Sequence, residues 1–114
     1  MNTVRDWTKV NLNPFQPLLT KELLEALPEP YATDGDAEAK ALVHFFGGPY
    51  DFYAKEFDPK MGEFFGLVHL HEWELGYVSA DELIGIRIPP LETRLERDEH
   101  WTPKTISEIR KGKP

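Results

Sequence analysis

The chain has 114 residues, of which 40% are hydrophobic and 12% aromatic, and this composition predicts a single packed domain rather than a disordered chain. It has no cysteine, which excludes disulfides, thiolate nucleophiles and zinc sites built on sulfur. Its formal net charge of −7 disfavours nonspecific binding to nucleic acid. No apolar run approaches the ~20 residues of a membrane span and no secretion signal precedes the domain, so we expect a cytoplasmic protein.

The first 16 residues show no sustained hydrophobic period. They contain Asn11, Asn13 and Pro14 and predict a leader that is flexible or draped on the domain, and Trp7 and Phe15 favour draping. We expect a single domain over residues 17–109 and a basic tail over residues 110–114.

A short helix is predicted to start after Thr20, whose hydroxyl can cap it, and to stop at Pro28. Its leucines have helical spacing and are expected to pack on a sheet. Residues 29–38 read as a loop, and residues 39–46 as the first strand. Gly47-Gly48-Pro49 then forms a turn into the next strand.

The centre of the chain, residues 50–71, predicts a β-hairpin whose turn is Asp58-Pro59-Lys60-Met61-Gly62. Pairing Phe57 with Glu63 places one set of side chains on the core face, namely Phe52, Ala54, Glu56, Phe64, Gly66, Val68 and Leu70. Glu56 is the one residue out of keeping with that face. The other face carries Tyr53, Lys55, Phe57, Phe65, Leu67, His69 and His71. Gly66 opposite Ala54 would let a helix lie close.

Another extended segment is predicted over residues 72–79, where Gly76 marks a bulge or a close approach. Ser79 should cap a helix over residues 80–84 that ends at Gly85. Residues 86–88 are expected to be extended, residues 91–97 to be loop and short extended structure, and residues 105–109 to form a final turn of helix. The sum is an α+β fold: a small antiparallel sheet of about four strands with short helices packed on one face.

The order and spacing of several blocks resemble the bacterial family called domain of unknown function 2958. These blocks are Leu18-Leu19-Thr20-Lys21-Glu22-Leu23 with Leu27-Pro28, Tyr31-Ala32-Thr33, Glu56-Phe57-Asp58-Pro59 with Gly62, Phe64-Phe65-Gly66-Leu67-Val68, Leu75-Gly76-Tyr77-Val78-Ser79 with Glu82-Leu83, and Glu96-Arg97-Asp98 with His100, Thr102 and Pro103. The resemblance covers roughly residues 17–109. It implies a protein carried on plasmids and other mobile elements, and it implies no activity, cofactor or catalytic residue.

Charge is distributed unevenly along the chain. Residues 29–82 hold twelve acidic and three basic side chains, whereas residues 83–114 hold five acidic and seven basic ones. Solubility alone can explain an acidic segment. The sharper hypothesis is an acidic surface around the aromatic hairpin that binds a basic protein, including one whose usual ligand is DNA.

Three groups of side chains are candidates for a site. His69 and His71 on one strand face could bind a metal if Asp51 or His100 supplied a third ligand, although a strand facing water is the simpler interpretation. Arg97 could clamp a carboxylate or phosphate, and Asp98 and His100 could act as acid and base. Bracing of the polypeptide is again the simpler role. Tyr50, Tyr53, Phe65 and Trp73 could form an aromatic platform, covered in part by Trp7 and Trp101.

The leading hypothesis is therefore a noncatalytic protein-binding module, with Tyr53, Phe65, Trp73 and Arg97 as binding residues and with no cofactor. The alternative is an enzyme or nucleic-acid-processing module that combines His69, His71, Asp98 and His100 in one cleft. A third hypothesis is weak DNA binding through Arg110, Lys111 and Lys113.

Overall fold

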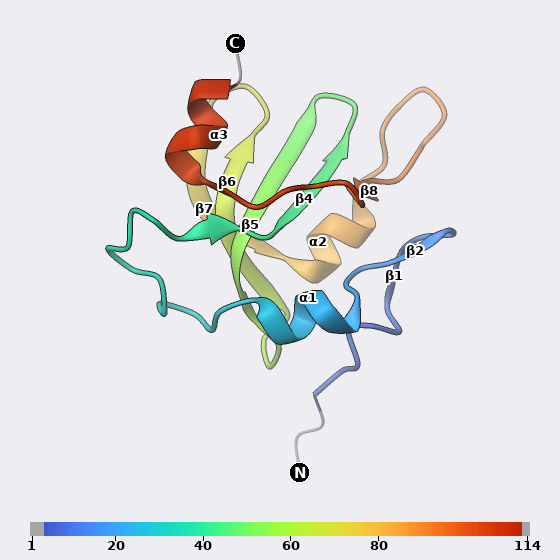
Figure 1. The fold of residues 1–114 in the computed structure, drawn as a ribbon. Helices are drawn as coiled ribbons and strands as arrows, with labels where there is room; N and C mark the ends of the chain where they lie inside the picture. The colour runs from blue at the N-terminus through green and yellow to red at the C-terminus, as the bar shows by residue number, and fades with distance from the viewer. Residues whose placement is uncertain (1–3, 113–114) are drawn as a thin grey trace.

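The computed structural model describes residues 4–112, which form an α+β fold built on one antiparallel sheet. The spatial order of its five strands is β7-β6-β5-β4-β8 (Figure 1). These strands are β4 (Val43–Gly47), β5 (Tyr50–Asp58), β6 (Glu63–His69), β7 (Trp73–Ser79) and β8 (Glu96–Arg97). The sequence predicted about four strands. The strand that it missed is β8, which has two residues and pairs with β4 through Arg97 and Phe45.

Two small strand pairs lie outside this sheet. Strand β1 (Asn11–Asn13) pairs with β2 (Gln16–Pro17), and β3 (Lys40–Ala41) pairs with β9 (Lys104–Thr105). The helices are α1 (Lys21–Ala26), α2 (Ala80–Gly85) and α3 (Ile106–Gly112). No helix in residues 4–112 is long and apolar enough to cross a membrane.

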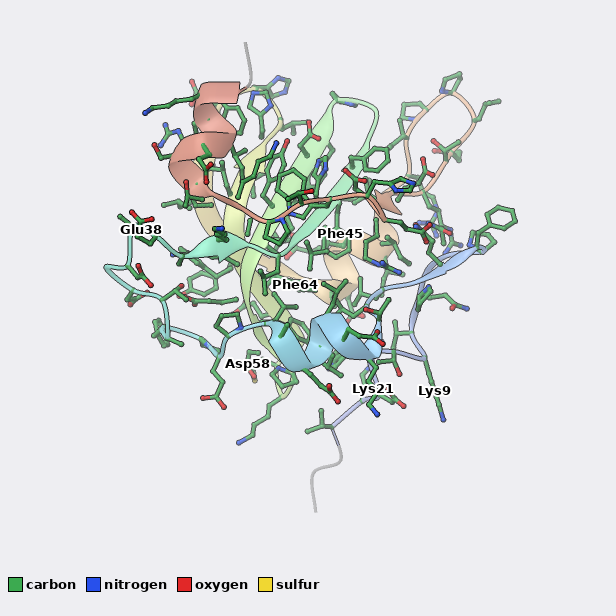
Figure 2. All side chains as sticks on the ribbon, in the orientation of Figure 1. Lys9, Lys21, Glu38, Phe45, Asp58 and Phe64 are labelled. Carbon is green, nitrogen blue, oxygen red and sulfur yellow. The ribbon has the colours of Figure 1, made fainter. Side chains whose placement is uncertain are left out.

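The larger core fills the space between one face of the sheet and helices α1 and α2. Phe45 and Phe64 lie at its centre and are fully buried, whereas Lys9, Lys21 and Glu38 point away from it (Figure 2). Leu27 is 8% exposed, and Leu23 and Leu24 pack against the same core. The predicted contact between the first helix and the hairpin is confirmed.

A smaller core lies on the opposite face of the sheet, which we call the second face. Here Ile109 of α3 packs with Ala41, Tyr53 and Leu67, and Trp101 lies against the cluster. Helices therefore cover both faces, and the prediction of helices on one face is wrong. The reason is that Ile106 and Ile109 give α3 an apolar stripe of its own, which needs a surface to cover it.

The predicted hairpin is present, but its register changes within it. Ala54 pairs with Gly66, while Glu56 pairs with Phe65 and Phe57 with Phe64, so one residue of β5 is unpaired between Ala54 and Glu56. This β-bulge moves every later side chain of β5 to the opposite face. The predicted pairing of Phe57 with Glu63 is wrong, Phe57 joins the larger core, and Glu56 turns to the second face.

Trp7 fixes the amino-terminal segment to the turn of this hairpin. Its indole Nε1 donates to Pro59 O at 2.9 Å, its ring meets Phe57 edge-on at 5.6 Å, and it is 3% exposed. Trp7 therefore lies in the larger core, and the prediction that it covers part of the aromatic platform is wrong. Phe15 is 93% exposed, so the expectation that it packs on the domain is wrong.

Ser79 caps α2 through a reciprocal pair of hydrogen bonds with Glu82. The Glu82 backbone N–H donates to Ser79 Oγ at 3.0 Å, and Glu82 Oε1 accepts from the Ser79 N–H at 3.3 Å. Because loss of such a cap leaves helix donors unpaired, Ser79→Ala is expected to lower the free energy of unfolding by about 1 kcal/mol. Urea unfolding measures this change. Ser107→Ala, at an exposed position in α3, is the control and should stay within about 0.5 kcal/mol of the wild type.

Candidate functional site

The second face of the sheet divides into a covered half and an open half. Tyr53 and Leu67 lie beneath α3 and Trp101, with Tyr53 only 1% exposed. Farther along β7, Leu75 is 53% exposed and Tyr77 is 50% exposed. In residues 4–112, β7 pairs with β6 alone, so this open half reaches the edge of the sheet.

Across the open half, the register places Glu56, Phe65 and Tyr77 side by side on β5, β6 and β7. The rings of Phe65 and Tyr77 are 4.9 Å apart at their centroids. The ammonium group of Lys55 lies 5.6 Å from the centroid of the Phe65 ring, within the range of a cation–π interaction.

Glu56 binds a loop against this row of side chains. The residue is 2% exposed, and its carboxylate accepts hydrogen bonds from the Tyr31 N–H at 2.8 Å, the Thr33 N–H at 3.1 Å and the Thr33 hydroxyl. Three donors satisfy a carboxylate that burial would otherwise make costly. The loop over residues 29–38 is therefore attached to the sheet at a defined point.

Tyr31 is the residue that this attachment positions. Its φ of 66° lies in the left-handed region, which L residues with large side chains rarely adopt, and its side chain is 67% exposed. A hydrogen bond between the Tyr31 and Tyr77 side chains raises the pKa of Tyr77 to about 12. Tyr31 and Tyr77, which are exposed, and Phe65, which is half-buried, thus form one aromatic group, which we call the tyrosine surface.

The tyrosine surface encloses a shallow groove with an acidic border. Its volume is ≈ 70 Å³, and its walls include Asp58 and Glu63 beside the three rings. Glu63 is exposed on β6, while Asp34 lies close enough to contribute to the raised Tyr77 pKa. Aromatic rings with carboxylates around them are chemically suited to a cationic side chain.

The Tyr31–Tyr77 hydrogen bond gives a testable pH dependence. A tyrosine whose pKa is raised from 10 to about 12 is stabilised in its neutral form, so this stabilisation is complete below pH 10 and is lost as the pH rises toward 12. Tyr31→Phe should return the Tyr77 pKa toward 10, since the hydrogen bond is its largest cause. Ultraviolet titration of tyrosinate measures it, with Tyr77→Phe identifying the transition. An unchanged Tyr77 transition in Tyr31→Phe would contradict the hydrogen bond.

A second polar cluster, His44 with Asp51 and Asp98, lies beside the covered half. His44 Nε2 is 2.7 Å from Asp51 Oδ1, and His44 Nδ1 is 3.4 Å from Asp98 Oδ2. Each ring nitrogen of His44 therefore faces the carboxylate of a different aspartate. The imidazole also stacks on Tyr53, with the ring centroids 4.3 Å apart and the planes at 7°. The His44 side chain is 12% exposed, so this cluster ties β4, β5 and the segment after β8 together.

Of the predicted histidine candidates, His69 lies opposite Asp51 of this cluster in the strand register. His69 stacks on Trp73 at 4.0 Å between ring centroids, and His71 and His100 are exposed on turns. Among residues 4–112, no group of three or more His, Asp or Glu side chains could hold a metal ion. Asp51, proposed as a third ligand, pairs with His69 in the strand register and lies 2.7 Å from His44 Nε2.

Arg97 and Asp98 connect the carboxy-terminal segment to the rest of the fold. The Asp98 N–H donates to His44 O at 2.8 Å, and Asp98 Oδ1 accepts from the His100 N–H at 3.0 Å. Both backbone polar groups of Arg97 bind the Gln16 side chain. These contacts fit the bracing interpretation.

The predicted binding residues have different environments. Tyr53 and Arg97 are 1% and 7% exposed, so neither offers a surface to a protein partner, while Phe65 and Trp73 are half-buried. Tyr50, the other platform candidate, packs against the larger core, and burial raises its pKa to about 12. Of the basic tail, Arg110 and Lys111 are exposed on α3, and Lys113 lies outside the described residues.

Sequence reasoning missed Tyr31, Tyr77 and His44 as site residues. For His44 a signal was present, because the two-residue turn Gly48-Pro49 fixes a register in which Asp51 lies diagonally opposite His44 on the same face. For Tyr31 the signal was indirect: an acidic residue, Glu56, on a face that otherwise reads as core.

Comparison of the chain with protein-family models, curated proteins and solved structures finds no match. The resemblance to domain of unknown function 2958 therefore stays a prediction.

Proposed function

We propose that this protein is a small noncatalytic recognition module that binds a basic segment of another protein on the tyrosine surface. The observation that carries the proposal is Tyr31, an exposed ring on a left-handed backbone held by a buried carboxylate.

The cost of that arrangement supports a functional role. A non-glycine residue in the left-handed region costs about 1–3 kcal/mol and persists only where its surroundings impose it. Here the surroundings are Glu56 and its three donors. A ring that stays 67% exposed returns little of this cost through burial. A partner that buries the Tyr31 ring would offset more of this free-energy cost.

The chemistry of the surface favours a basic partner. Tyrosines are common at the centres of protein interfaces, where their rings supply rigid contact area and their hydroxyls supply hydrogen bonds. The acidic side chains Asp34, Asp58 and Glu63 surround the rings, and Lys55 already places an ammonium group near Phe65. An arginine or lysine from a partner would meet both the ring faces and the carboxylates.

The surroundings of the candidate catalytic residues also favour recognition over catalysis. His69 stacks on Trp73, His71 and His100 are exposed on turns, and Asp98 is engaged with His44. A role in a bacterial mobile element belongs to the same proposal and rests on the family resemblance alone.

Site-specific photocrosslinking tests the proposal. A photoreactive phenylalanine analogue at position 77, introduced in cells that express the protein, is expected to crosslink to a lysine- or arginine-rich segment of a single protein. The same analogue at Leu91, which is 81% exposed outside the tyrosine surface, is the control and should not capture that protein. Tyr31→Ser should reduce the yield at position 77 by at least about fivefold if the ring contributes ~1 kcal/mol of binding. Equal capture from both positions, or a captured segment without basic residues, would overturn the proposal.

A further inference from the structure

A hollow of ≈ 370 Å³ lies between the start of α1, strand β4 and the segment after β8. Its apolar walls are Leu23, Leu42, Val43 and Trp101, and its polar lining includes Thr20 and Arg97. This volume falls within the range of small-molecule sites, which combine apolar walls with a few polar groups. The hollow lies apart from the tyrosine surface, so a ligand bound in it would be independent of the proposed function.

Arg97 is a buried cation whose hydrogen-bonding capacity is largely unused. It is 7% exposed, and its guanidinium makes one side-chain hydrogen bond, a long one of 3.4 Å from Nη2 to Pro17 O. Its buried Nε finds no partner among residues 4–112, and these residues give Arg97 no ion pair. Leaving the buried Nε donor of this guanidinium unpaired is costly.

Two acidic side chains also border the hollow and bear on its charge. The Asp98 carboxylate is occupied by His44 and by the His100 N–H. Glu99 is exposed and accepts from Gln16 Nε2 at 3.1 Å. Burial lowers the pKa of Arg97 and the charge of Glu99 opposes that effect, but no carboxylate is hydrogen-bonded to the guanidinium. An added anion could therefore bind the Arg97 guanidinium without displacing a carboxylate.

Thr20 offers a further donor at the same place. Its Oγ1 accepts from the Leu23 N–H at 3.2 Å, which leaves the hydroxyl hydrogen able to point elsewhere. Leu23 and Trp101 line the hollow next to these polar groups.

We propose that this hollow binds a small free carboxylic acid with a branched or aromatic body. The carboxylate is held by the Arg97 guanidinium and the Thr20 hydroxyl, and the apolar body lies against Leu23, Leu42 and Trp101. The guanidinium is the group best matched to a carboxylate, since it can donate two parallel hydrogen bonds.

Titration of the full ¹⁵N-labelled chain with 4-methylpentanoate tests the proposal by NMR. Saturable shifts are expected at the backbone amides of Thr20, Leu23 and Leu42 and at the Trp101 indole N–H, which donates to Ala41 O. The neutral analogue 4-methylpentanamide should bind at least about tenfold more weakly, because hydrogen bonds to a charged group contribute ~1.5–3 kcal/mol. Shifts that do not saturate, or equal binding of the amide, would overturn the proposal.

Two further ligands define the class of acid. Inorganic phosphate should bind more weakly than 4-methylpentanoate, since it has no apolar body. Equal binding of phosphate would replace the proposal with a general anion site. A tripeptide acid ending in leucine that bound more tightly than the free acid would replace it with recognition of a protein carboxy terminus.

Variants complete the test. Arg97→Lys keeps the charge but loses the paired donors, and it should weaken 4-methylpentanoate binding at least about tenfold. Because a change at a buried position can unfold the chain, Leu23→Phe serves as a second variant that fills the hollow without touching the cation. It should block binding while the remaining amide spectrum is retained. Arg94→Lys, at an exposed position near β8, is the matched control. Binding that survives in both Arg97→Lys and Leu23→Phe would overturn the site.

Discussion

Replacing Gly66 with alanine is expected to destabilise the fold by about 3 kcal/mol or more. A Cβ at this position would lie 2.0 Å from Tyr53 O and 2.8 Å from Ala54 Cα, both backbone atoms of the neighbouring strand. The backbone of β5 cannot move aside, because it is paired on both edges and its side chains fill both cores. Overpacking at a rigid place costs about 1–3 kcal/mol or more. Urea unfolding measures the change, and loss of the folded state at 25 °C would be the same result in its extreme form.

Gly76 supplies a matched control for this substitution. It pairs directly with Gly66 on the adjacent strand, yet a Cβ there would have no atom within 4 Å. Gly76 is therefore neither the bulge nor the close approach that its sequence position predicts. Gly76→Ala should leave stability within about 0.5 kcal/mol or raise it slightly, since glycine weakens a strand. Equal losses at Gly66 and Gly76 would show that strand propensity, and not the approach of β5, decides the effect.

The close approach at Gly66 illustrates which parts of the fold local sequence can predict. Gly66 opposite Ala54 followed from the hairpin pattern, but the expected neighbour was a helix, whereas the observed neighbour is the β5 backbone. The turn over Asp58–Gly62 and the caps at Thr20 and Ser79 were predictable, because each uses residues within a few positions of one another.

The missed features depend on contacts between distant parts of the chain. Strand β8 is two residues of a charged run and becomes a strand only by pairing with β4, about fifty positions earlier. The β-bulge in β5 contains no glycine or proline, so the local sequence does not predict it. It is supported by Phe57, which must reach the larger core, and by Glu56, which must reach the loop at Tyr31.

The tyrosine surface was predictable only in part for the same reason. The acidic, aromatic character of the hairpin was visible in the sequence, and Phe65 was among the expected binding residues. Tyr31 lies in a proline-containing loop whose conformation depends on a carboxylate 25 positions away. An indirect sign of this contact was visible in the sequence, because Glu56 did not fit an apolar face. A buried carboxylate without partners is too costly, so Glu56 had to have hydrogen-bond donors elsewhere in the chain.

Replacing Glu56 with alanine is expected to lower the free energy of unfolding by about 2 to 3 kcal/mol. The substitution removes a charged acceptor of three hydrogen bonds and leaves the N–H groups of Tyr31 and Thr33 without their partner. Urea unfolding gives the size of the loss. The control is Glu63→Ala, an exposed carboxylate on the same side of the hairpin, which should change stability by about 0.5 kcal/mol or less.

The Glu56→Ala variant also distinguishes a local effect on the loop over residues 29–38 from a loss of stability of the whole fold. Without the Glu56 carboxylate, the hydrogen bond that holds the left-handed backbone of Tyr31 is lost. Amide hydrogen exchange at Tyr31 and Thr33 should therefore accelerate more than exchange in β6. The pKa of Tyr77 should fall from about 12 toward 10 as its hydrogen bond to Tyr31 is lost. Crosslinking from position 77 should fall together with these two measurements. A loop that stays protected and a Tyr77 pKa that stays near 12 in Glu56→Ala would show that the tyrosine surface does not depend on this carboxylate.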